Sequence, residues 1–167
     1  MINKVITGGQ TGADQAALDA AIKLGVPHGG WIPKGRITEE GPLADKYDLI
    51  EMPTADYAAR TEKNIIQSDG TLILSHGELT GGSKLTEELA KAHRKACLHK
   101  DLNDRLLVEV ASEVHIWVEG NGIEVLNVAG PRASKDPAIY ESTFYIVCSI
   151  LYLGKIGAPA GATLEDY

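Results

Sequence analysis

Apolar and polar positions follow two different periods along this chain. Short apolar runs predict strands, and they occur at residues 5–6, 29–33, 48–51, 71–75, 97–102 and 123–129. Helical spacing predicts helices between them, at residues 13–24, 57–68, 84–96, 103–119 and 138–153. This alternation predicts an α/β fold, with a doubly wound, mainly parallel sheet and helices on both of its faces.

Three glycine-bearing turns each follow a predicted strand and precede a predicted helix, at residues 8–12, 80–83 and 130–132. Because the carboxyl ends of parallel strands lie at one edge of a sheet, the three turns should meet at the edge where open α/β sheets bind ligands. Free N–H groups at a helix start, together with the positive end of the helix dipole, form a site for phosphate. The pattern therefore predicts a phosphate or nucleotide site at this edge.

The predicted ligand-binding residues come from these turns, from the strand before the third turn and from a polar, glycine-rich loop at residues 34–47. Arg132 can clamp a phosphate with two hydrogen bonds, and Arg36 can close over the ligand from the loop. The full set is Gly8, Gly9, Gln10, Thr11, Gly12, Asp14, Arg36, Thr80, Gly81, Gly82, Ser83, Asn127, Gly130 and Arg132.

Several of these residues have a second interpretation. Thr11 and Asp14 fit a capping box at the start of the first predicted helix. Asp14 repels phosphate, so it serves as a cap or binds a hydroxyl or base N–H of the ligand. Asn127 either locks a loop by a hydrogen bond or contacts the ligand. The first turn matches neither G-x-G-x-x-G nor a Walker loop, and taken alone it is equally an ordinary tight turn.

Composition narrows the function class. The chain has 167 residues, a net charge of −7 and a pI of about 5.2. The negative net charge disfavours general electrostatic binding of nucleic acid. Its longest apolar run, residues 145–153, reaches about half the length of a membrane span. The first residues lead directly into a strand without a signal peptide, so we expect a cytoplasmic protein. Neither the two cysteines nor the five histidines have metal-ligand spacing, and no catalytic residue or metal site is predicted.

The chain resembles the molybdenum (cofactor) carrier family. The matching segments are ITGGQTGADQAALDAA (6–21), GWIPKGRITEEGPL (30–43), EKNIIQSDGTLIL (62–74), LTGGSKLTEELA (79–90) and LNVAGPRASKDPAIY (126–140). That family is similar to a branch of the nucleotide-ligand-sensing Rossmann-like superfamily. The superfamily also holds the lysine decarboxylase-like phosphoribohydrolases and the DprA-like DNA-binding proteins.

The resemblance implies a Rossmann-like sheet and a homo-oligomer, a dimer or a tetramer. It also implies an anionic pocket built by residues 8–12 and 80–83, which binds a small phosphate-bearing ligand. The implied cargo is the molybdenum cofactor (molybdopterin) or a nucleotide. We expect one ligand-binding domain at residues 1–153, followed by a loosely attached tail at residues 154–167.

Two alternatives to a carrier remain open. One is a nucleoside-monophosphate phosphoribohydrolase that cleaves an N-glycosidic bond, with Glu87 or Glu88 as general acid or base. The hydrolase motif P-G-G-x-G-T-x-x-E is only partly present at residues 80–88, where the proline and the later glycine are missing and the glutamates are out of register. The other is a scaffold whose pocket has lost its ligand.

Overall fold

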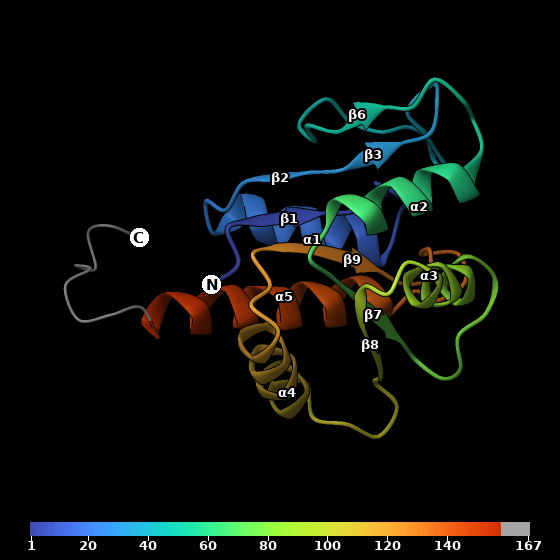
Figure 1. Cartoon of the computed structure of the whole chain (residues 1–167). Helices are drawn as coiled ribbons and strands as arrows, with labels where there is room; N and C mark the ends of the chain where they lie inside the picture. Colours follow the sequence, from blue (N-terminus) through green and yellow to red (C-terminus); the bar gives the residue numbers. More distant parts are fainter. Residues whose placement is uncertain (158–167) are drawn as a thin grey trace.

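A five-stranded parallel sheet forms the centre of the computed structural model, which describes residues 1–157 (Figure 1). The strand order is β2-β1-β9-β7-β8, and every neighbouring pair is parallel. The strands are β1 (Lys4–Ile6), β2 (His28–Gly29), β7 (Gly70–Ser75), β8 (Ala96–Asp101) and β9 (Val125–Ala129). The predicted Rossmann-like, doubly wound α/β fold is confirmed.

Helices cover both faces of the sheet. The large core lies on the face covered by α1 (Ala13–Lys23), α4 (Leu107–Gly120) and α5 (Ile139–Ile156), and Leu72 and Leu74 of β7 belong to the same apolar cluster as residues of these three helices. Alanines of α1 belong to this core, and their small side chains let the helix approach the sheet closely. The other face carries α2 (Tyr57–Gln67) and α3 (Gly81–Ala92), which pack against each other (Figure 1).

Residues 31–51 form an arm with a small core of its own. In it, β3 (Trp31–Ile32) pairs in parallel with β6 (Ile50–Glu51), and β4 (Ile37–Thr38) forms an antiparallel hairpin with β5 (Gly41–Pro42). Its buried residues, together with one leucine of α1, are Leu18, Ile32, Leu43, Tyr47 and Leu49. The interpretation of residues 34–47 as a polar loop outside the core was therefore wrong. Its buried apolar residues are isolated in the sequence and follow no helix or strand period, so the pattern does not indicate that they are buried.

Several helix boundaries differ from the pattern. Helix α3 ends at Ala92, four residues before its predicted end, and α4 begins at Leu107, four residues after its predicted start. Helix α3 begins at Gly81, three residues before its predicted start. Gly81 and Gly82 lie in the first turn, where backbone N–H groups have no acceptor within the helix, so these glycines do not break it. Helix α5 continues to Ile156, beyond the predicted end at residue 153. The predicted tail thus begins inside α5, and residues 158–167 lie outside the described part of the chain. Among residues 1–157, no helix has the length and apolar character needed to cross a membrane.

Candidate functional site

The three glycine turns meet at the carboxyl edge of the sheet, as predicted, because they follow the adjacent strands β1, β9 and β7. The glycines of the first and third turns let these turns touch each other. A Cβ on Gly12, whose φ is +79°, would lie 2.5 Å from the Pro131 carbonyl oxygen. A Cβ on Gly130 would lie 2.5 Å from the Leu74 carbonyl oxygen and 2.7 Å from Ala13 Cβ. Close packing of backbone on backbone therefore requires both glycines.

A cavity of about 600 Å³ opens at this edge, on the face of the sheet that carries α2 and α3. Its volume suits a ligand of nucleotide size. Nine of the predicted site residues line it: Gly8, Gln10, Asp14, Thr80, Gly82, Ser83, Asn127, Gly130 and Arg132. The other five predicted residues, Gly9, Thr11, Gly12, Arg36 and Gly81, are not part of its lining.

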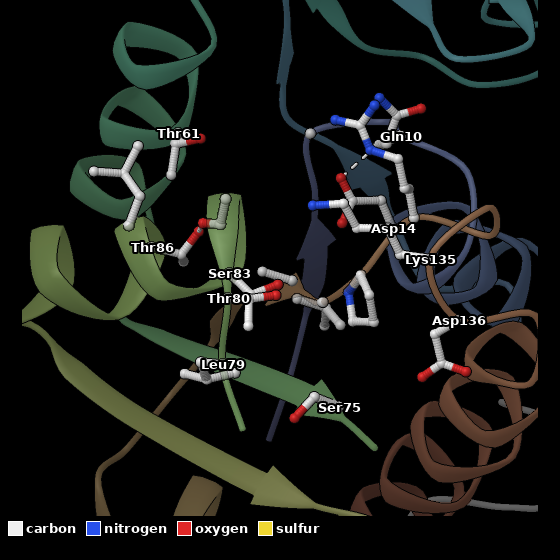
Figure 2. Close-up of a pocket in the computed structure, with 18 of the residues that line it drawn as sticks. Gln10, Asp14, Thr61, Ser75, Leu79, Thr80, Ser83, Thr86, Lys135 and Asp136 are labelled. Carbon is white, nitrogen blue, oxygen red and sulfur yellow. Dashed lines mark hydrogen bonds between the residues drawn. The ribbon is translucent and has the colours of Figure 1, made fainter. Parts of the chain in front are cut away.

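Three N–H groups of the first turn donate to side chains of the protein. The Gln10 N–H donates to Asp14 Oδ2 (3.2 Å), and the Gly9 N–H donates to Thr7 Oγ1 (3.0 Å). The Thr11 N–H donates to the Gln10 side-chain oxygen (3.0 Å). The Asp14 carboxylate therefore takes the place that a phosphate oxygen would have at the Gln10 N–H (Figure 2).

The predicted capping box is wrong. Gly12, not Thr11, is the N-cap of α1, and no side chain caps this helix. The Thr11 hydroxyl instead donates to Glu39 of the arm and accepts the Ala133 N–H (3.1 Å). Thr11 thus joins the first turn to the arm and to the loop before α5.

Asp14 and Arg60 form a buried pair of unlike charges beside the cavity. Burial raises the pKa of Asp14 to about 6, against the lowering effects of Arg60 and of the Gln10 and Gly8 backbone N–H groups. Burial likewise lowers the pKa of Arg60, which Asp14 partly offsets. The Arg60 guanidinium donates to the Gly8 carbonyl oxygen and places a fixed cation at the cavity wall.

Sequence reasoning missed the contribution of α2. Tyr57, Arg60, Thr61 and Asn64 line the cavity. They lie at positions i, i+3, i+4 and i+7, which is one face of a helix. That polar face was a usable signal, but a polar helix face ordinarily indicates contact with solvent.

The start of α3 supplies free backbone donors. Thr80 is the N-cap, and its side chain makes no capping bond. Within residues 1–157, no hydrogen-bond acceptor meets the backbone N–H groups of Gly81, Gly82 and Ser83. A Cβ on Gly82 would meet no heavy atom within 4 Å, so space is open directly beside these donors.

Two basic residues of the loop before α5 complete this end of the cavity. Arg132 and Lys135 line it, and Lys135 Nζ lies 3.2 Å from the position of a Cβ on Gly81 (Figure 2). An anion at the start of α3 would therefore meet three N–H groups, the positive helix end and two cationic side chains. The arrangement is suited to a phosphate group.

The Asn127 side chain makes a hydrogen bond between two strands of the sheet. Its Nδ2 donates to Thr71 Oγ1 (3.2 Å), and the two residues are register partners on β9 and β7. Asn127 also lines the cavity. Because this bond joins strands and does not lock a loop, both the loop lock and the ligand contact stay predictions.

Arg36 was expected to close over the ligand, but the structure places it elsewhere. Its guanidinium donates to the carbonyl oxygens of Tyr47 (2.9 Å), Leu49 (3.2 Å) and Ala44 (3.2 Å). Arg36 therefore holds the arm together. Glu87 and Glu88, the acids of the hydrolase alternative, are also absent from the described residues that line the cavity.

Comparisons with known proteins agree with the fold. A family model described as the circularly permutated YpsA SLOG family matches residues 5–151. The chain is 54% identical to a protein of Syntrophus aciditrophicus SB, whose crystal structure is named that of a "Putative molybdenum carrier protein". The match has a TM-score of 0.88 and covers 90% of this chain and 95% of that one. No curated protein matches the chain. The resemblance to the molybdenum carrier family, within the SLOG superfamily, is confirmed.

Proposed function

This chain belongs to the circularly permutated YpsA SLOG family, and on that premise we propose that it binds and carries a phosphate-bearing nucleotide-like or pterin ligand. One observation carries the proposal. At the start of α3, three backbone N–H groups without an acceptor in the described part of the chain open onto a cavity of about 600 Å³. A helix N-terminus whose N–H groups are free and face open space is well suited to bind a phosphate.

The phosphate end of the ligand lies, in this proposal, against Gly81, Gly82 and Ser83, with Arg132 and Lys135 on its other side. The first turn is less suited to the phosphate, because three of its N–H groups already donate to side chains of the protein. Of the two turns predicted to bind phosphate, residues 8–12 and 80–83, the proposal therefore assigns the phosphate to the second.

Other residues of the cavity lining suit a planar heterocycle. Tyr57 and Thr61 of α2 contribute an aromatic ring and a hydroxyl, and Gln10 contributes an amide. Asp14 adds a carboxyl whose pKa is raised to about 6 by burial, so near neutral pH it can accept a hydrogen bond from a ring N–H. A pterin or a purine offers such N–H groups at its edge.

The neighbour's name supports a molybdenum-bearing cargo. Among residues 1–157, no group of three or more His, Cys, Asp or Glu side chains is arranged to hold a metal ion. The residues present do fit a phosphate group, at the start of α3. We therefore propose that a molybdopterin cargo is recognised through its phosphate and its ring.

Ligand binding by two matched variants tests the proposal. Gly82→Val adds a side chain beside the free N–H groups, where a Cβ meets no atom within 4 Å, so it fills the phosphate site without a clash. Gly120→Val is the control, because Gly120 also has open space around it but lies at the end of α4, away from the cavity. Thermal shift and isothermal calorimetry would use guanosine 5′-monophosphate, molybdopterin, inorganic phosphate and molybdate.

We expect a phosphate-bearing ligand to raise the melting temperature of the unmodified chain and of Gly120→Val, but not of Gly82→Val. At a ligand concentration of 100 times Kd the stabilisation is about 2.7 kcal/mol, well within reach of the measurement. No shift with any phosphate-bearing ligand contradicts the proposal, and so does an undiminished shift in Gly82→Val.

A further inference from the structure

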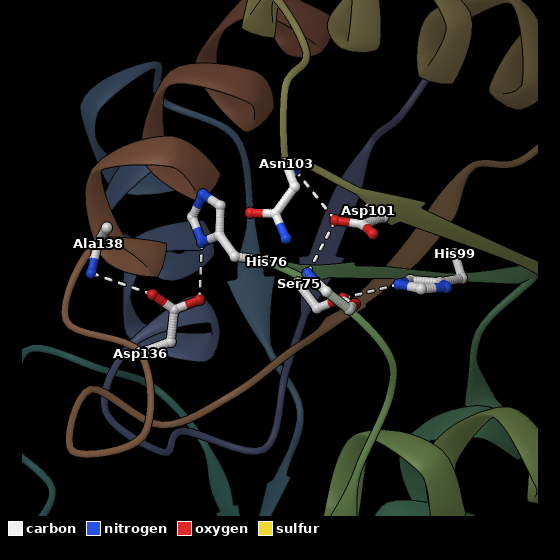
Figure 3. Close-up of polar contacts among 8 residues, drawn as sticks. Ser75, His76, His99, Asp101, Asn103, Asp136 and Ala138 are labelled. Carbon is white, nitrogen blue, oxygen red and sulfur yellow. Dashed lines mark hydrogen bonds and ion pairs between the residues drawn. The ribbon is translucent and has the colours of Figure 1, made fainter.

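A histidine and an aspartate meet at the cavity without a role in the binding described above. His76 follows β7, and Asp136 lies in the loop before α5; both line the cavity. His76 Nδ1 lies 2.7 Å from Asp136 Oδ2, and Asp136 Oδ1 accepts the Ala138 N–H (3.2 Å) (Figure 3). The two side chains are 27% and 15% exposed, so water reaches the pair only in part.

The chemistry of the pair decides which ring nitrogen of His76 carries the hydrogen. An ionised carboxylate only accepts hydrogen bonds, so Nδ1 must donate to Asp136. In a neutral imidazole the lone pair then resides on Nε2. Among residues 1–157, the ring of His76 has no hydrogen-bond partner other than Asp136 at Nδ1, so Nε2 has none. The arrangement is that of a general base, oriented and supported by a carboxylate.

We propose that His76 and Asp136 make this cavity a hydrolytic site for phosphate monoesters. This inference rests on the proposed function, because the substrate phosphate must sit at the start of α3. A water molecule gives a proton to His76 Nε2 while its oxygen forms a new bond to phosphorus. The P–O bond to the alcohol breaks, and the alcohol oxygen takes the electron pair and then a proton from solvent, while His76 Nε2 returns its proton to solvent. The products are inorganic phosphate and the free alcohol.

The surroundings of the pair support this reaction. Lys135 directly precedes Asp136, and its Nζ lies 3.2 Å from the position of a Cβ on Gly81, at the proposed phosphate site. Arg132, on the same loop, also lines the cavity. The free N–H groups at the start of α3 face the charge that gathers on the phosphoryl oxygens in the transition state. Asp136 acts through His76 and is a positioning residue, whereas His76 contacts the attacking water.

A purely structural role is the alternative, in which the pair only ties the loop after β7 to the loop before α5. The variant His76→Asn separates the two roles. Its side-chain amide can take the place of Nδ1 and donate to Asp136, so the tie between the loops is kept, but the base Nε2 is gone. His115→Asn is the matched control, because His115 lies on α4 and does not line the cavity.

The experiment measures release of inorganic phosphate from guanosine 5′-monophosphate, adenosine 5′-monophosphate and p-nitrophenyl phosphate, in water enriched in ¹⁸O. Binding of inorganic phosphate, followed by calorimetry, and the melting temperature are measured for the same preparations. Gly82→Val serves as the control for contaminating phosphatases, because it should neither bind phosphate nor release it.

We expect the unmodified chain and His115→Asn to release phosphate that carries one ¹⁸O atom from water. His76→Asn should lose about 100-fold or more of the rate, as is usual for a general base, while phosphate binding and melting temperature stay unchanged. Phosphate binding without release from any of the three esters overturns the inference and leaves the proposed function standing.

Equal rates in His76→Asn, or an absence of ¹⁸O from the phosphate, also overturn the inference. Failure of every phosphate-bearing ligand to bind contradicts the proposed function itself. The release and isotope measurements need only the unmodified chain, so the inference stays falsifiable even where His76→Asn does not fold.

Discussion

The guanidinium of Arg60 lies directly against Gly8, and a Cβ on Gly8 would lie 1.9 Å from Arg60 Nη1. The same guanidinium donates to the Gly8 carbonyl oxygen. The first glycine turn therefore holds a buried arginine of α2 at the cavity wall. Gly8 is needed for the close approach of a side chain of the protein itself, whereas the turn was predicted to make room for a ligand.

Gly8→Ala should displace the Arg60 side chain. The hydrogen bond to the Gly8 carbonyl would be lost, which costs about 1–3 kcal/mol of unfolding free energy because the donor is charged and buried. The cation would also move away from Asp14, whose pKa, now raised to about 6, should rise further. Urea denaturation and NMR titration of the Asp14 carboxyl check the two effects. An unchanged Asp14 titration would show that Arg60 does not act on this carboxyl.

The stability of the chain should depend on pH through Asp14. Burial raises the pKa of this carboxyl in the folded state from 3.8 to about 6, so between these values the unfolded chain has lost a proton that the folded chain still holds. Stability contributed by the protonated group is thus complete below about pH 4 and is lost as pH rises through about 6. A shift of this size corresponds to about 3 kcal/mol.

Asp14→Asn should abolish this dependence, because an amide does not titrate, and should be the more stable chain at pH 7. The measurement is the difference in unfolding free energy between the variant and the unmodified chain at pH 4.5 and pH 7. Taking that difference removes the opposite trend of Glu39, Asp101 and Glu113, whose pKa values are lowered by their hydrogen bonds. A difference that is the same at both pH values would contradict the prediction.

Glu39 should hold the arm onto the site. Its carboxylate accepts the Ser134 N–H (3.1 Å) and the Ser134 hydroxyl (2.5 Å), and it also accepts the Thr11 hydroxyl. Glu39→Gln removes the charge from these bonds, so we expect faster amide hydrogen exchange across residues 37–42. Glu40→Gln is the matched control, since the Glu40 side chain makes none of these bonds. Equal exchange in both variants would show that the charge of Glu39 does not hold the arm.

Gly130→Ala should destabilise the fold, and this effect should not require a bound ligand. The new Cβ would lie 2.5 Å from the Leu74 carbonyl oxygen and 2.7 Å from Ala13 Cβ, and neither the strand nor the helix can move freely. Overpacking of this kind costs about 1–3 kcal/mol. Gly120→Ala, where the Cβ meets nothing within 4 Å, should leave the urea midpoint unchanged or raise it. A stable Gly130→Ala chain would mean that the turns after β1 and β9 can separate at little cost.

Much of the fold was predictable because its signals are local. The run at residues 71–75 has the apolar character of a buried parallel strand, and β7 occupies residues 70–75 with every residue buried. The three glycine turns were placed at one edge from chain order alone, since parallel strands present the same end there. The family resemblance rested on these same turns.

The site was predictable only in outline. Nine of the predicted residues line the cavity, but Arg36 binds carbonyl groups of the arm instead. Arg60, His76 and Asp136 were missed, because each gains its role from a contact across the fold. Arg60 and Gly8 are 52 residues apart in sequence, and His76 and Asp136 are 60 apart. No local pattern in the sequence indicates such a contact.

The sequence by itself thus determined the α/β class, the succession of strands and helices along the chain, and the edge of the sheet at which the glycine turns meet. These features follow from hydrophobic period and from the fixed direction of parallel strands. Only the tertiary structure decided which backbone donors are free. Three N–H groups of the first turn donate to Thr7, Gln10 and Asp14, whereas those of residues 81–83 at the start of α3 have no partner among residues 1–157. A glycine turn looks the same in sequence in both cases, because whether its donors are free depends on which side chains the rest of the fold brings to it.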